Sequence, residues 1–433
     1  MPHRLEPLLN PKSIAVIGAS ERANTPGREI MENLLAGGYS GPLYAVNPGY
    51  ESVCGVPCYP DVAALPQSVE QVFIAVGDTH VEGAFQQAID HGARSATIIC
   101  SLAETPDGQP LKARMQALAE TSGMLVMGGN TMGYYNFAAG TWACAFDTRD
   151  NHVPHGGIAL ITHSGSGLSG LIDCEERLDC NLAISTGQEL TVRMDEYMDY
   201  ALDQPTTRVI GLFMETARDP AGLRAALRKA RERKIPVVAL KVGKTELSAR
   251  LAESHSGAMA GQDSAFQALF DRYGVIRVDD LDEFTTTLIM FSQPHPVAEG
   301  GLVALHDSGG ERQLLVDLAD ELEVPLANLA AETVSKLEAR LDPGLPAINP
   351  LDAWSAGGPG YHHVMEDCMA ALMADPAAAM GAVVHDRAPF AKIYPDYIGY
   401  LRKGFGASGK PVFLVANRQG TGSDPAVVEV TRE

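Results

Sequence analysis

The sequence predicts an α/β protein built from several parallel sheets. Short runs of β-branched and apolar residues alternate with segments of helical periodicity, which is the pattern of parallel strands joined by right-handed crossovers. In the first part of the chain the strand-like runs are SIAVIGAS, PLYAVNP, QVFIAVGD, ATIICS and GMLVMGGN. The helical segments between them include GREIMENLLAGG and VEGAFQQAIDHG, and each is closed by glycine.

This strand–helix pattern restarts twice. A second series begins at GGIALITHSGSGLSGLIDCEERL and continues with VIGLFMET and IPVVALKVGK. A third begins at GGLVALHDSGGERQLLVDLADEL and continues with GAVVHDR and KPVFLVANRQ. The restarts favour three Rossmann- or flavodoxin-like modules over one large sheet, and 433 residues agree with roughly three domains of about 150 residues. We expect these domains to span residues 1–128, 129–295 and 296–433.

Composition narrows the function classes. With 45% hydrophobic and 20% charged residues, the chain has an ordinary globular composition. A net charge of −21 argues against binding to nucleic-acid phosphates, which requires basic surface. Apolar runs fall short of the roughly 20 residues that span a bilayer, and MPHRLEPLLNPKS lacks the apolar segment of a signal peptide. Seven cysteines without a C-x-x-C pair indicate reduced thiols. We therefore expect a cytoplasmic protein that binds neither nucleic acid nor membrane.

The first glycine turn differs from a dinucleotide-binding fingerprint. Gly18, Ala19 and Ser20 follow the first strand, but the next glycine is Gly27, so G-x-G-x-x-G is absent. The second strand ends in Asn47-Pro48, where an NAD site would carry an acidic residue. A nucleotide can still bind at this edge with its phosphates on a helix N-terminus. A plain tight turn is the alternative.

Two further strands run into Ser-Gly turns that begin helices. The turns are Ser164-Gly165-Ser166-Gly167 and Ser308-Gly309-Gly310. Backbone N–H groups, a positive helix end and a hydroxyl suit a phosphate, although close packing also explains such glycines. The sequence around Ser166 is not the G-x-S-x-G of a hydrolase, and G-x-x-x-x-G-K-[ST] is absent.

The stretch ARLAESHSGAMAG places His255 among small residues, two positions after Glu253. Such a histidine is either an exposed loop side chain or one that accepts a group and transfers it. The small neighbours predict a loop that can move.

With these motifs, the sequence resembles the α part of NDP-forming acyl-CoA synthetases, the group of the ADP-forming acetate–CoA ligases and a relative of succinyl-CoA synthetase. The resemblance runs from LLNPKSIAVIGAS through LKVGKTELSARLAESHSGAMAG to AINPLDAW. SHSGAMAG matches the family's SHTGALAG, whose histidine becomes phosphorylated. The resemblance implies an N-terminal Rossmann-like CoA-binding domain and two flavodoxin-like domains of the succinyl-CoA synthetase type. It also implies a last domain cut short at VVEVTRE.

The resemblance implies roles for individual residues. His255 is the phosphorylated residue, and Glu215 is the carboxylate that orients it and stabilises its imidazolium. The implied CoA contacts are Gly18, Ala19, Ser20, Asn47, Pro48, Val76 and Cys100. The implied phosphate contacts are Ser164, Gly165, Ser166, Ser308, Gly309 and Gly310. No metal ligand is implied in this chain. The sequence departs from the family at Thr162-His163, where Ser-Gln is usual, and at Gln188, where Asn is usual.

The implied reaction interconverts acyl-CoA, NDP and phosphate with a carboxylic acid, CoA and NTP. ATP or ADP and Mg²⁺ would bind to an ATP-grasp β subunit or fused domain, and an oligomer is expected. Two alternatives remain: a non-catalytic CoA-binding regulatory module, and a component of a CoA-dependent acyltransferase.

Overall fold

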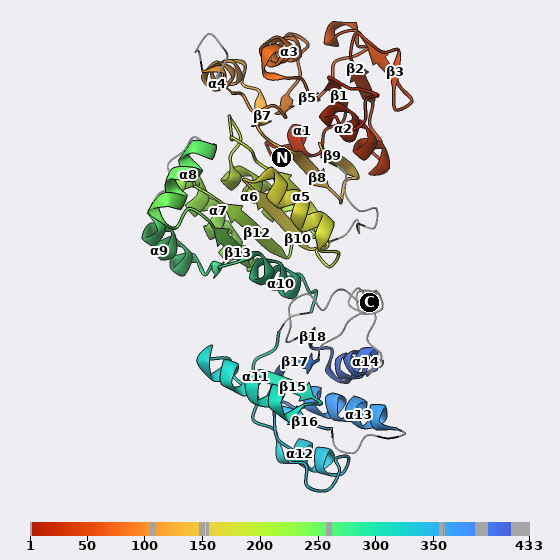
Figure 1. The fold of residues 1–433 in the computed structure, drawn as a ribbon, viewed down its shortest axis with the longest axis vertical. Coiled ribbons are helices and arrows are strands. Elements are labelled where there is room, and N and C mark those ends of the chain that lie inside the picture. Colours follow the sequence, from red (N-terminus) through yellow and green to blue (C-terminus); the bar gives the residue numbers. More distant parts are fainter. Residues whose placement is uncertain are drawn as a thin grey trace. The chain divides into compact units, whose positions relative to one another are not determined.

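The computed structural model describes residues 2–103, 110–146, 152, 156–256, 262–295, 297–354, 358, 360–385 and 397–416, with the backbone alone for residues 252–256. The chain divides into two compact units, Met1–Ser292 and Gln293–Glu433 (Figure 1). The first unit contains two seven-stranded sheets and the second contains one four-stranded sheet.

The first sheet has the strand order β3-β4-β2-β1-β5-β6-β7. Apart from the pairing of β3 with β4, its strands are parallel. The strands are β1 (Ile14–Ile17), β2 (Leu43–Val46), β3 (Ser52–Val53), β4 (Val56–Tyr59), β5 (Gln71–Ile74), β6 (Ser95–Ile98) and β7 (Leu125–Gly128). The helices are α1 (Glu6–Leu9), α2 (Pro26–Ala36), the 3₁₀ turn η1 (Val62–Ala64), α3 (Asp78–Asp90) and α4 (Leu111–Ser122).

Both faces of the first sheet are covered, so its central strands are apolar throughout. All four residues of β1 are buried. Ile14 and Val16 pack in the core that contains Ile30 of α2, whereas Ala15 packs in the core that contains Phe85 of α3. Helices on both faces explain why the sequence shows continuous apolar runs instead of alternation.

The second sheet has the order β14-β13-β12-β10-β11-β8-β9. Its strands are β8 (Gly133–Asn136), β9 (Thr141–Cys144), β10 (Ile158–Thr162), β11 (Cys180–Ser185), β12 (Val209–Met214), β13 (Val237–Lys241) and β14 (Ile276–Val278). Its helices are α5 (Gly165–Cys174), α6 (Met194–Asp203), α7 (Pro220–Arg233), α8 (Glu246–Ser256), α9 (Asp263–Tyr273) and α10 (Leu281–Phe291). β8 pairs antiparallel with both β9 and β11, and the other neighbouring strands are parallel.

The bounds of α7 illustrate how the sequence sets a helix. Asp219 caps the N-terminus by accepting from the N–H groups of Ala221 and Gly222, and Pro220 occupies the first helical position. Arg231 and Arg233 lie in the last turn, where their charge offsets the negative end of the helix dipole.

The two sheets of the first unit share one hydrophobic core. Phe73 of β5 and Tyr197 of α6 belong to the same cluster of buried side chains. The amide of Asn136 in β8 donates to the carbonyl of Leu9 at the end of α1 (2.9 Å). This common core explains why the two sheets form one compact unit.

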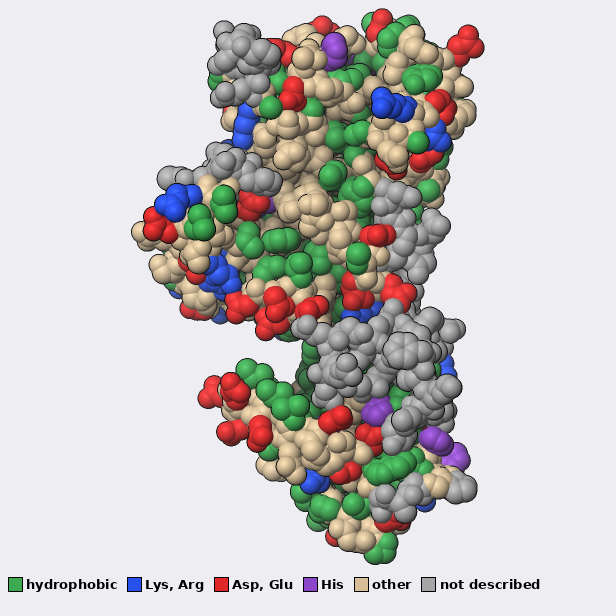
Figure 2. Space-filling view, viewed as in Figure 1, with side chains coloured by type: hydrophobic (Ala, Val, Ile, Leu, Met, Phe, Trp, Pro, Cys, Tyr) green, Lys and Arg blue, Asp and Glu red, His purple; other side chains and the backbone are tan. Residues whose placement is uncertain are grey.

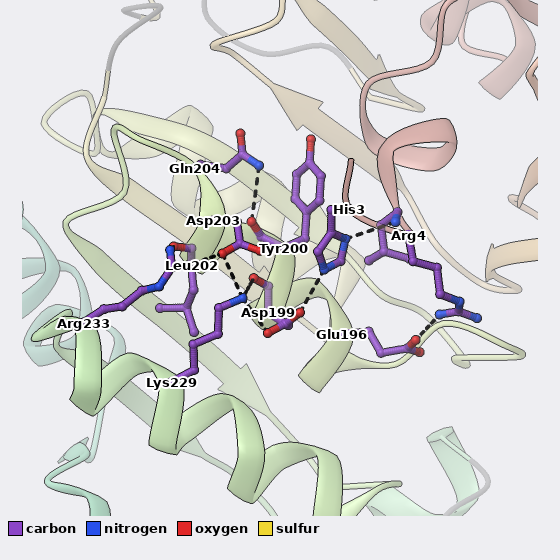
Figure 3. A network of polar contacts seen from close by, with 11 residues as sticks. His3, Arg4, Glu196, Asp199, Tyr200, Leu202, Asp203, Gln204, Lys229 and Arg233 are labelled. Carbon is purple, nitrogen blue, oxygen red and sulfur yellow. Dashed lines mark hydrogen bonds and ion pairs between the residues drawn. The ribbon is translucent and has the colours of Figure 1, made fainter. Parts of the chain in front are cut away.

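A polar network also joins the start of the chain to the second sheet's helices (Figure 3). His3 Nδ1 accepts from a backbone N–H (3.1 Å), so Nε2 carries the proton and donates to Asp199 Oδ2 of α6 (2.9 Å). Lys229 of α7 lies between two carboxylates, 2.6 Å from Asp199 and 3.0 Å from Asp203. Arg233 pairs with the same Asp203 oxygen at 2.6 Å.

The second unit contains a parallel sheet in the order β16-β15-β17-β18. Its strands are β15 (Gly301–His306), β16 (Leu351–Asp352), β17 (Ala378–Val384) and β18 (Val412–Val415). Its helices are α11 (Gly309–Glu321), α12 (Ala331–Glu338), α13 (Tyr361–Met373) and α14 (Tyr397–Ser408). Met369 of α13, Tyr400 of α14 and Leu305 of β15 lie in its core.

The surface and composition show further features that bear on function. Acidic side chains gather over α10, and apolar side chains are exposed along α11 (Figure 2).

All seven cysteines are unpaired. The two tryptophans lie in different units, Trp142 in β9 and Trp354 after β16. Among the helices that the structure describes, none is long and apolar enough to cross a membrane.

The predicted fold class is confirmed: the chain is an α/β protein with a Rossmann-like first sheet followed by two flavodoxin-like sheets. The change from the first sheet to the second lies between Gly128 and Gly133, because β7 ends at the former and β8 begins at the latter.

Candidate functional site

The predicted CoA contacts lie along the carboxyl edge of the first sheet. The strand order reverses between β1 and β5, since β2 lies on one side of β1 and β6 on the far side of β5. Gly18 follows β1 and Val76 follows β5 by two residues. Ligands of open α/β sheets bind at such a reversal, where the two loops turn away from each other.

Gly18 is required by the backbone at this edge. Its φ is +87°, and a Cβ there would lie 2.6 Å from the carbonyl oxygen of Ala75. Its N–H donates to the carbonyl of Val46 at the end of β2 (2.9 Å). A side chain would push the three strand ends apart, so the glycine keeps this edge compact.

Asn47 ties the loop after β2 to the loop after β1. Its amide donates to the carbonyl of Ala19 (2.8 Å), and its Oδ1 accepts from the N–H of Gly49 (2.9 Å). Ser20 Oγ lies 3.4 Å from the hydroxyl of Tyr50. Asn47 thus shapes the turn. Pro48, the next residue, is exposed in the same loop.

The loop after β6 is held by Asp78, a residue that the sequence analysis missed. Its carboxylate accepts from the N–H groups of Leu102 and Ala103, both at 3.0 Å, and from Ser101 Oγ at 3.1 Å. Burial, reinforced by Asp78, raises the pKa of the Cys100 thiol to about 12. Cys100 is therefore a protonated thiol at neutral pH and suits contact with a ligand, not nucleophilic attack. The available signal for Asp78 was its position as the first residue of the helix after β5.

Glu215 and the first Ser-Gly turn meet at the carboxyl edge of the second sheet. Thr162 of β10 pairs with Phe213 of β12, and Met214 pairs with Lys241 of β13. Ser164 follows β10 and Glu215 follows β12, so they end neighbouring strands. The strand order also reverses between β10 and β12. Ser164 and Glu215, two of the predicted site residues of this domain, are thus at one edge.

Ser164 caps helix α5. Its Oγ accepts from the N–H of Gly167 (3.1 Å), and the N–H groups of Gly165 and Ser166 lie at the positive end of the helix outside this cap. Packing also requires the glycines. A Cβ at Gly165 would lie 2.6 Å from Met132 Cγ, and one at Gly167 would lie 2.8 Å from the Phe213 ring. The turn therefore combines tight packing with an anion-binding geometry.

A buried polar network, absent from the sequence-based site, supports this edge. His163 Nδ1 accepts from the N–H of Glu215 (2.9 Å), so Nε2 carries the proton and donates to Glu189 Oε1 (3.2 Å). Glu189 Oε2 pairs with Arg218 Nε at 3.2 Å, and the Glu189 side chain is 1% exposed. The unusual His163 at this turn was visible in the sequence, but its partners lie on loops 26 and 52 residues away.

Lys241 places a cation on the same edge. Its side chain is buried, with the ammonium 4.7 Å from the centre of the Phe266 ring. Burial lowers its pKa, while Asp263 and Glu215 act in the opposite direction. Lys244, by contrast, pairs with the exposed Asp279.

The structure corrects the expectation that His255 lies in a loop. Its backbone belongs to the last turn of α8. The segment ELSARLAESHS contains good helix formers, and Arg250 pairs with Glu246 one turn earlier at 3.1 Å. The side chains of Glu253 and His255, and the residues 257–261 of the predicted loop, lie outside the described part of the structure.

The loop between β11 and α6 links the two edges of the first unit. The N–H of Gln188 donates to the carbonyl of Gly129 (2.7 Å), and its side-chain amide donates to the carbonyl of Ser101 (2.8 Å). Leu190 donates to Gly128 (3.0 Å). Glu189 of the same loop holds His163. Gln188 thus contacts the loop that carries Cys100, and the next residue, Glu189, contacts His163 beside the Ser164 turn.

The second Ser-Gly turn, Ser308-Gly309-Gly310, begins α11 in the second unit. Ser308 Oγ accepts from the N–H of Glu311 (3.4 Å). A Cβ at Gly309 would lie 3.1 Å from Asp352 Oδ2, while one at Gly310 would have more room. Burial lowers the pKa of His306, at the end of β15, to about 4. With Asp352 close to Gly309 and with Asp307 and Glu311 on either side of the turn in the sequence, this turn lies among acidic side chains.

Two protein families match the chain. The family described as CoA binding domain matches residues 12–136, and the succinyl-CoA ligase like flavodoxin domain matches residues 155–291. The first unit thus contains a CoA-binding domain and a succinyl-CoA ligase-like domain.

Similar proteins are ADP-forming acetate–CoA ligases. The chain is 30% identical over 364 residues to the acetate–CoA ligase [ADP-forming] II subunit alpha of Pyrococcus furiosus, covering 83% of this chain and 78% of that protein. It is 31% identical over 356 residues to acetate–CoA ligase [ADP-forming] I of Archaeoglobus fulgidus, covering 80% of this chain and 50% of that protein. The chain spans about half the length of the first curated relatives it matches.

A solved structure has the same fold. The dinucleotide-forming acetyl-coenzyme A synthetase 1 of Candidatus Korarchaeum cryptofilum, in complex with phosphate and ADP, gives a TM-score of 0.84 at 24% identity. The match covers 98% of this chain and 90% of that one. From the subunit alpha relative and the two matched domains, we conclude that the chain belongs to the family of ADP-forming acetate–CoA ligases.

Proposed function

We propose that the chain is the CoA-binding and phosphohistidine-bearing component of an NDP-forming acyl-CoA synthetase. It would interconvert an acyl-CoA, NDP and phosphate with a carboxylic acid, CoA and NTP. The observation that carries this proposal is the meeting of Glu215, Lys241 and the Ser164 turn at adjacent strand ends, with helix α8 and His255 following β13.

The chemistry begins with the thioester. A phosphate oxygen attacks the acyl carbon, the C–S bond breaks, and CoA leaves as the thiol, so that an acyl phosphate forms. The N–H groups at the start of α5 are suited to a phosphate there, and Lys241, at the end of the second strand from β10, adds a cation to the same edge. We propose Ser164, Gly165 and Ser166 as the groups that hold it.

The phosphoryl group then moves to His255. The lone pair of a neutral imidazole nitrogen attacks phosphorus, the P–O bond to the acyl oxygen breaks, and the carboxylate leaves. The second ring nitrogen keeps its proton, and we propose that Glu215 accepts a hydrogen bond from it and stabilises the imidazolium. Attack by an NDP oxygen later breaks the N–P bond and forms NTP.

For CoA, we propose the strand-order reversal of the first sheet. The loops that carry Gly18, Ala19 and Ser20, Asn47 and Pro48, Val76, and Cys100 all border this edge. Support comes from the matched CoA binding domain and from the glycine geometry at residue 18. We also keep the three-domain division at residues 1–128, 129–295 and 296–433 as a proposal, supported by the three separate sheets.

For the nucleotide, we propose an ATP-grasp partner that binds ATP or ADP with Mg²⁺, as a separate β subunit or as a fused domain. Relatives whose names include subunit alpha support a separate chain. The acid is proposed to be a small carboxylic acid. Relatives are named for acetate, 4-hydroxybutyrate and feruloyl substrates, so an acid panel must identify it.

The test uses the full chain without a partner. Incubated with ³²P-labelled acetyl phosphate, the protein should acquire acid-labile, base-stable phosphate, which mass spectrometry should locate at His255. On addition of acetate and CoA, the label should leave: an acetate oxygen attacks phosphorus and the N–P bond breaks to give acetyl phosphate, from which CoA then releases labelled inorganic phosphate as acetyl-CoA forms. His255→Asn is the control for the labelled position and should remain unlabelled while calorimetry shows unchanged CoA binding.

Other acyl phosphates extend the test to other acids. If none of the acyl phosphates in the panel labels the chain although CoA binds, the chain is a CoA-binding module, and the phosphohistidine mechanism is wrong. Label retained by His255→Asn would refute the assignment of the residue.

A further inference from the structure

A group of potential metal ligands lies at the carboxyl edge of the sheet in the second unit. His385 Nδ1, after β17, is 3.2 Å from Asp307 Oδ1, after β15. With Glu311 in the first turn of α11, they place one ligand atom each within 4.8 Å of one another. For a tetrahedral ion with bonds of about 2.0–2.2 Å, neighbouring ligand atoms lie roughly 3.4 Å apart. The cluster therefore needs only small side-chain movements to hold an ion.

The topology favours a ligand at this point. The strand order reverses between β15 and β17, because β16 lies on one side of β15 and β18 on the far side of β17. Asp307 and His385 are the first residues after these two strands. The cluster thus occupies the position at which open parallel sheets bind their ligands.

A second, independent observation is His306. Its side chain is fully buried, and neither ring nitrogen has a hydrogen-bond partner within the described structure. A buried polar group without a partner destabilises the fold unless a bound water or ion satisfies it. His306 lines a cavity that also borders Asp307 and His385. The space open to the centre of a water-sized sphere in it is about 10 Å³, which is room for about one water molecule or ion.

The other cluster of this kind in the described residues contains His3, Asp199 and Asp203. There, Lys229 already places its ammonium against both carboxylates, at 2.6 and 3.0 Å (Figure 3). Beside Asp307, the charged neighbours are different. Asp352 lies close to Gly309, and Arg312 acts on His306 electrostatically. The cation site near His3 is thus filled by a lysine, and it provides a matched control.

We propose that Asp307, Glu311 and His385 bind a divalent first-row transition-metal ion, with His306 accepting a hydrogen bond from a water on that ion. One imidazole and two carboxylates suit Zn²⁺, Co²⁺ or Mn²⁺ better than Mg²⁺, which prefers oxygen ligands alone in octahedral geometry. Three protein ligands leave a fourth position for the water.

The ion would also change what the adjacent Ser308 turn can bind. Asp307, Glu311 and Asp352 surround the start of α11, and their charges would repel a phosphate there. A dication neutralises two of these charges and makes the positive helix end available to an anion. The site goes beyond the proposed reaction, because it depends on neither CoA nor His255.

The experiment titrates the full chain, after removal of metals by a chelator, with Co²⁺ as the optical probe and Zn²⁺ as the competitor. We expect one bound Co²⁺ per chain, d–d absorption bands of a low-symmetry site, and no thiolate charge-transfer band from the seven cysteines. Zn²⁺ should displace the Co²⁺, whereas Mg²⁺ at a hundredfold excess should not. Displacement by Mg²⁺ at equal concentration would refute the mixed nitrogen and oxygen ligand set.

Variants locate the site. Asp307→Asn and His385→Gln should each abolish the Co²⁺ bands, with circular dichroism unchanged. His306→Gln should weaken Co²⁺ binding about tenfold, as expected for a group that acts through a bound water. Asp199→Asn and His255→Asn should bind one Co²⁺ as the wild type does. Bands that survive in both Asp307→Asn and His385→Gln, or that disappear in Asp199→Asn, would overturn the proposal.

Discussion

At the scale of single residues, His163 joins three strand ends through its two ring nitrogens. It accepts from the N–H of Glu215 and donates to Glu189, which in turn pairs with Arg218. Glu189 and His163 are almost fully buried, and Glu189 Oε1 accepts from both His163 and the N–H of Met194 (2.8 Å), so His163 is one member of a buried network. A glutamine can also accept with its oxygen and donate with its nitrogen, whereas a leucine can do neither.

We therefore predict that His163→Leu lowers the free energy of unfolding by about 2–4 kcal/mol, because it removes the acceptor of the buried Glu215 N–H and one of the donors to the buried Glu189 carboxylate. His163→Gln should lose less than about 1 kcal/mol. Urea unfolding of the full chain, monitored by a signal from the first unit, measures the free energies of unfolding of both variants. Equal losses in the two variants would show that volume alone matters at this position.

Glu215 is predicted to act on the phosphoryl transfer itself. Glu215→Gln keeps the size of the side chain but removes the charge that stabilises the imidazolium, and should slow the labelling of His255 by acetyl phosphate by about 10²–10⁴-fold. The concentration of acetyl phosphate at half-maximal rate should change little. Glu253→Gln, on the helix that carries His255, is the matched control and should label at the wild-type rate. A slowing below threefold in Glu215→Gln would remove Glu215 from the mechanism.

At the scale of the secondary-structure elements, the first turn of α6 contains a carboxyl group in an unfavourable place. Burial raises the pKa of Asp195 from 3.8 to about 6, and the carboxylates of Glu196, Asp219 and Glu189 add to the shift. A Cβ added to Gly222 of α7 would lie only 2.1 Å from Asp195 Oδ2. The two helices therefore pack closely around this carboxyl group. The folded state therefore holds this proton more tightly than the unfolded state does.

The sign of the pH dependence follows. Between about pH 4 and pH 6 the folded chain retains the Asp195 proton that the unfolded chain has released, so the contribution of this group to stability falls as pH rises. Asp195→Asn does not titrate, and should raise the free energy of unfolding by about 1 kcal/mol at pH 7–8, allowing for solvent screening. The difference from wild type should vanish below pH 4. Urea midpoints of both proteins across this range measure it, and a difference that grows towards low pH would contradict the assignment.

At the scale of the whole molecule, local patterns in the sequence carry the fold class. The apolar runs predicted the strands β1, β5 and β6, and the glycines that follow α2 and α3 predicted where these helices end. These signals are local, because they depend only on residues close together in the sequence. The antiparallel pair β8 and β9 was not predicted as part of the second sheet, because four-residue strands show too little alternation and their partner β11 lies about 45 residues further on.

The site was predicted less completely, for a related physical reason. Glu215 and Ser164 end strands, so strand order brings them together once the sheet is known. The pairing of His163 with Glu189, and the hold of Asp78 on the loop after β6, depend on side-chain directions across loops, which no local pattern encodes. At His255 the prediction of a loop gave too much weight to local signals, the small residues after it. In the structure the helix-forming residues before His255 extend α8 through this position.

The separation of the two tryptophans has a practical consequence for spectroscopy. Trp142 is packed against Tyr135 and Phe137 in the first unit, and Trp354 lies 4.1 Å from the ring of Tyr361 in the second. Replacing either tryptophan with phenylalanine leaves tryptophan fluorescence, excited selectively over tyrosine, that reports on one unit alone. The backbone N–H of Trp354 donates to Asp352, which neighbours the Ser308 turn, so this indole lies two residues from a group at that edge and its emission can serve as an optical signal for events there.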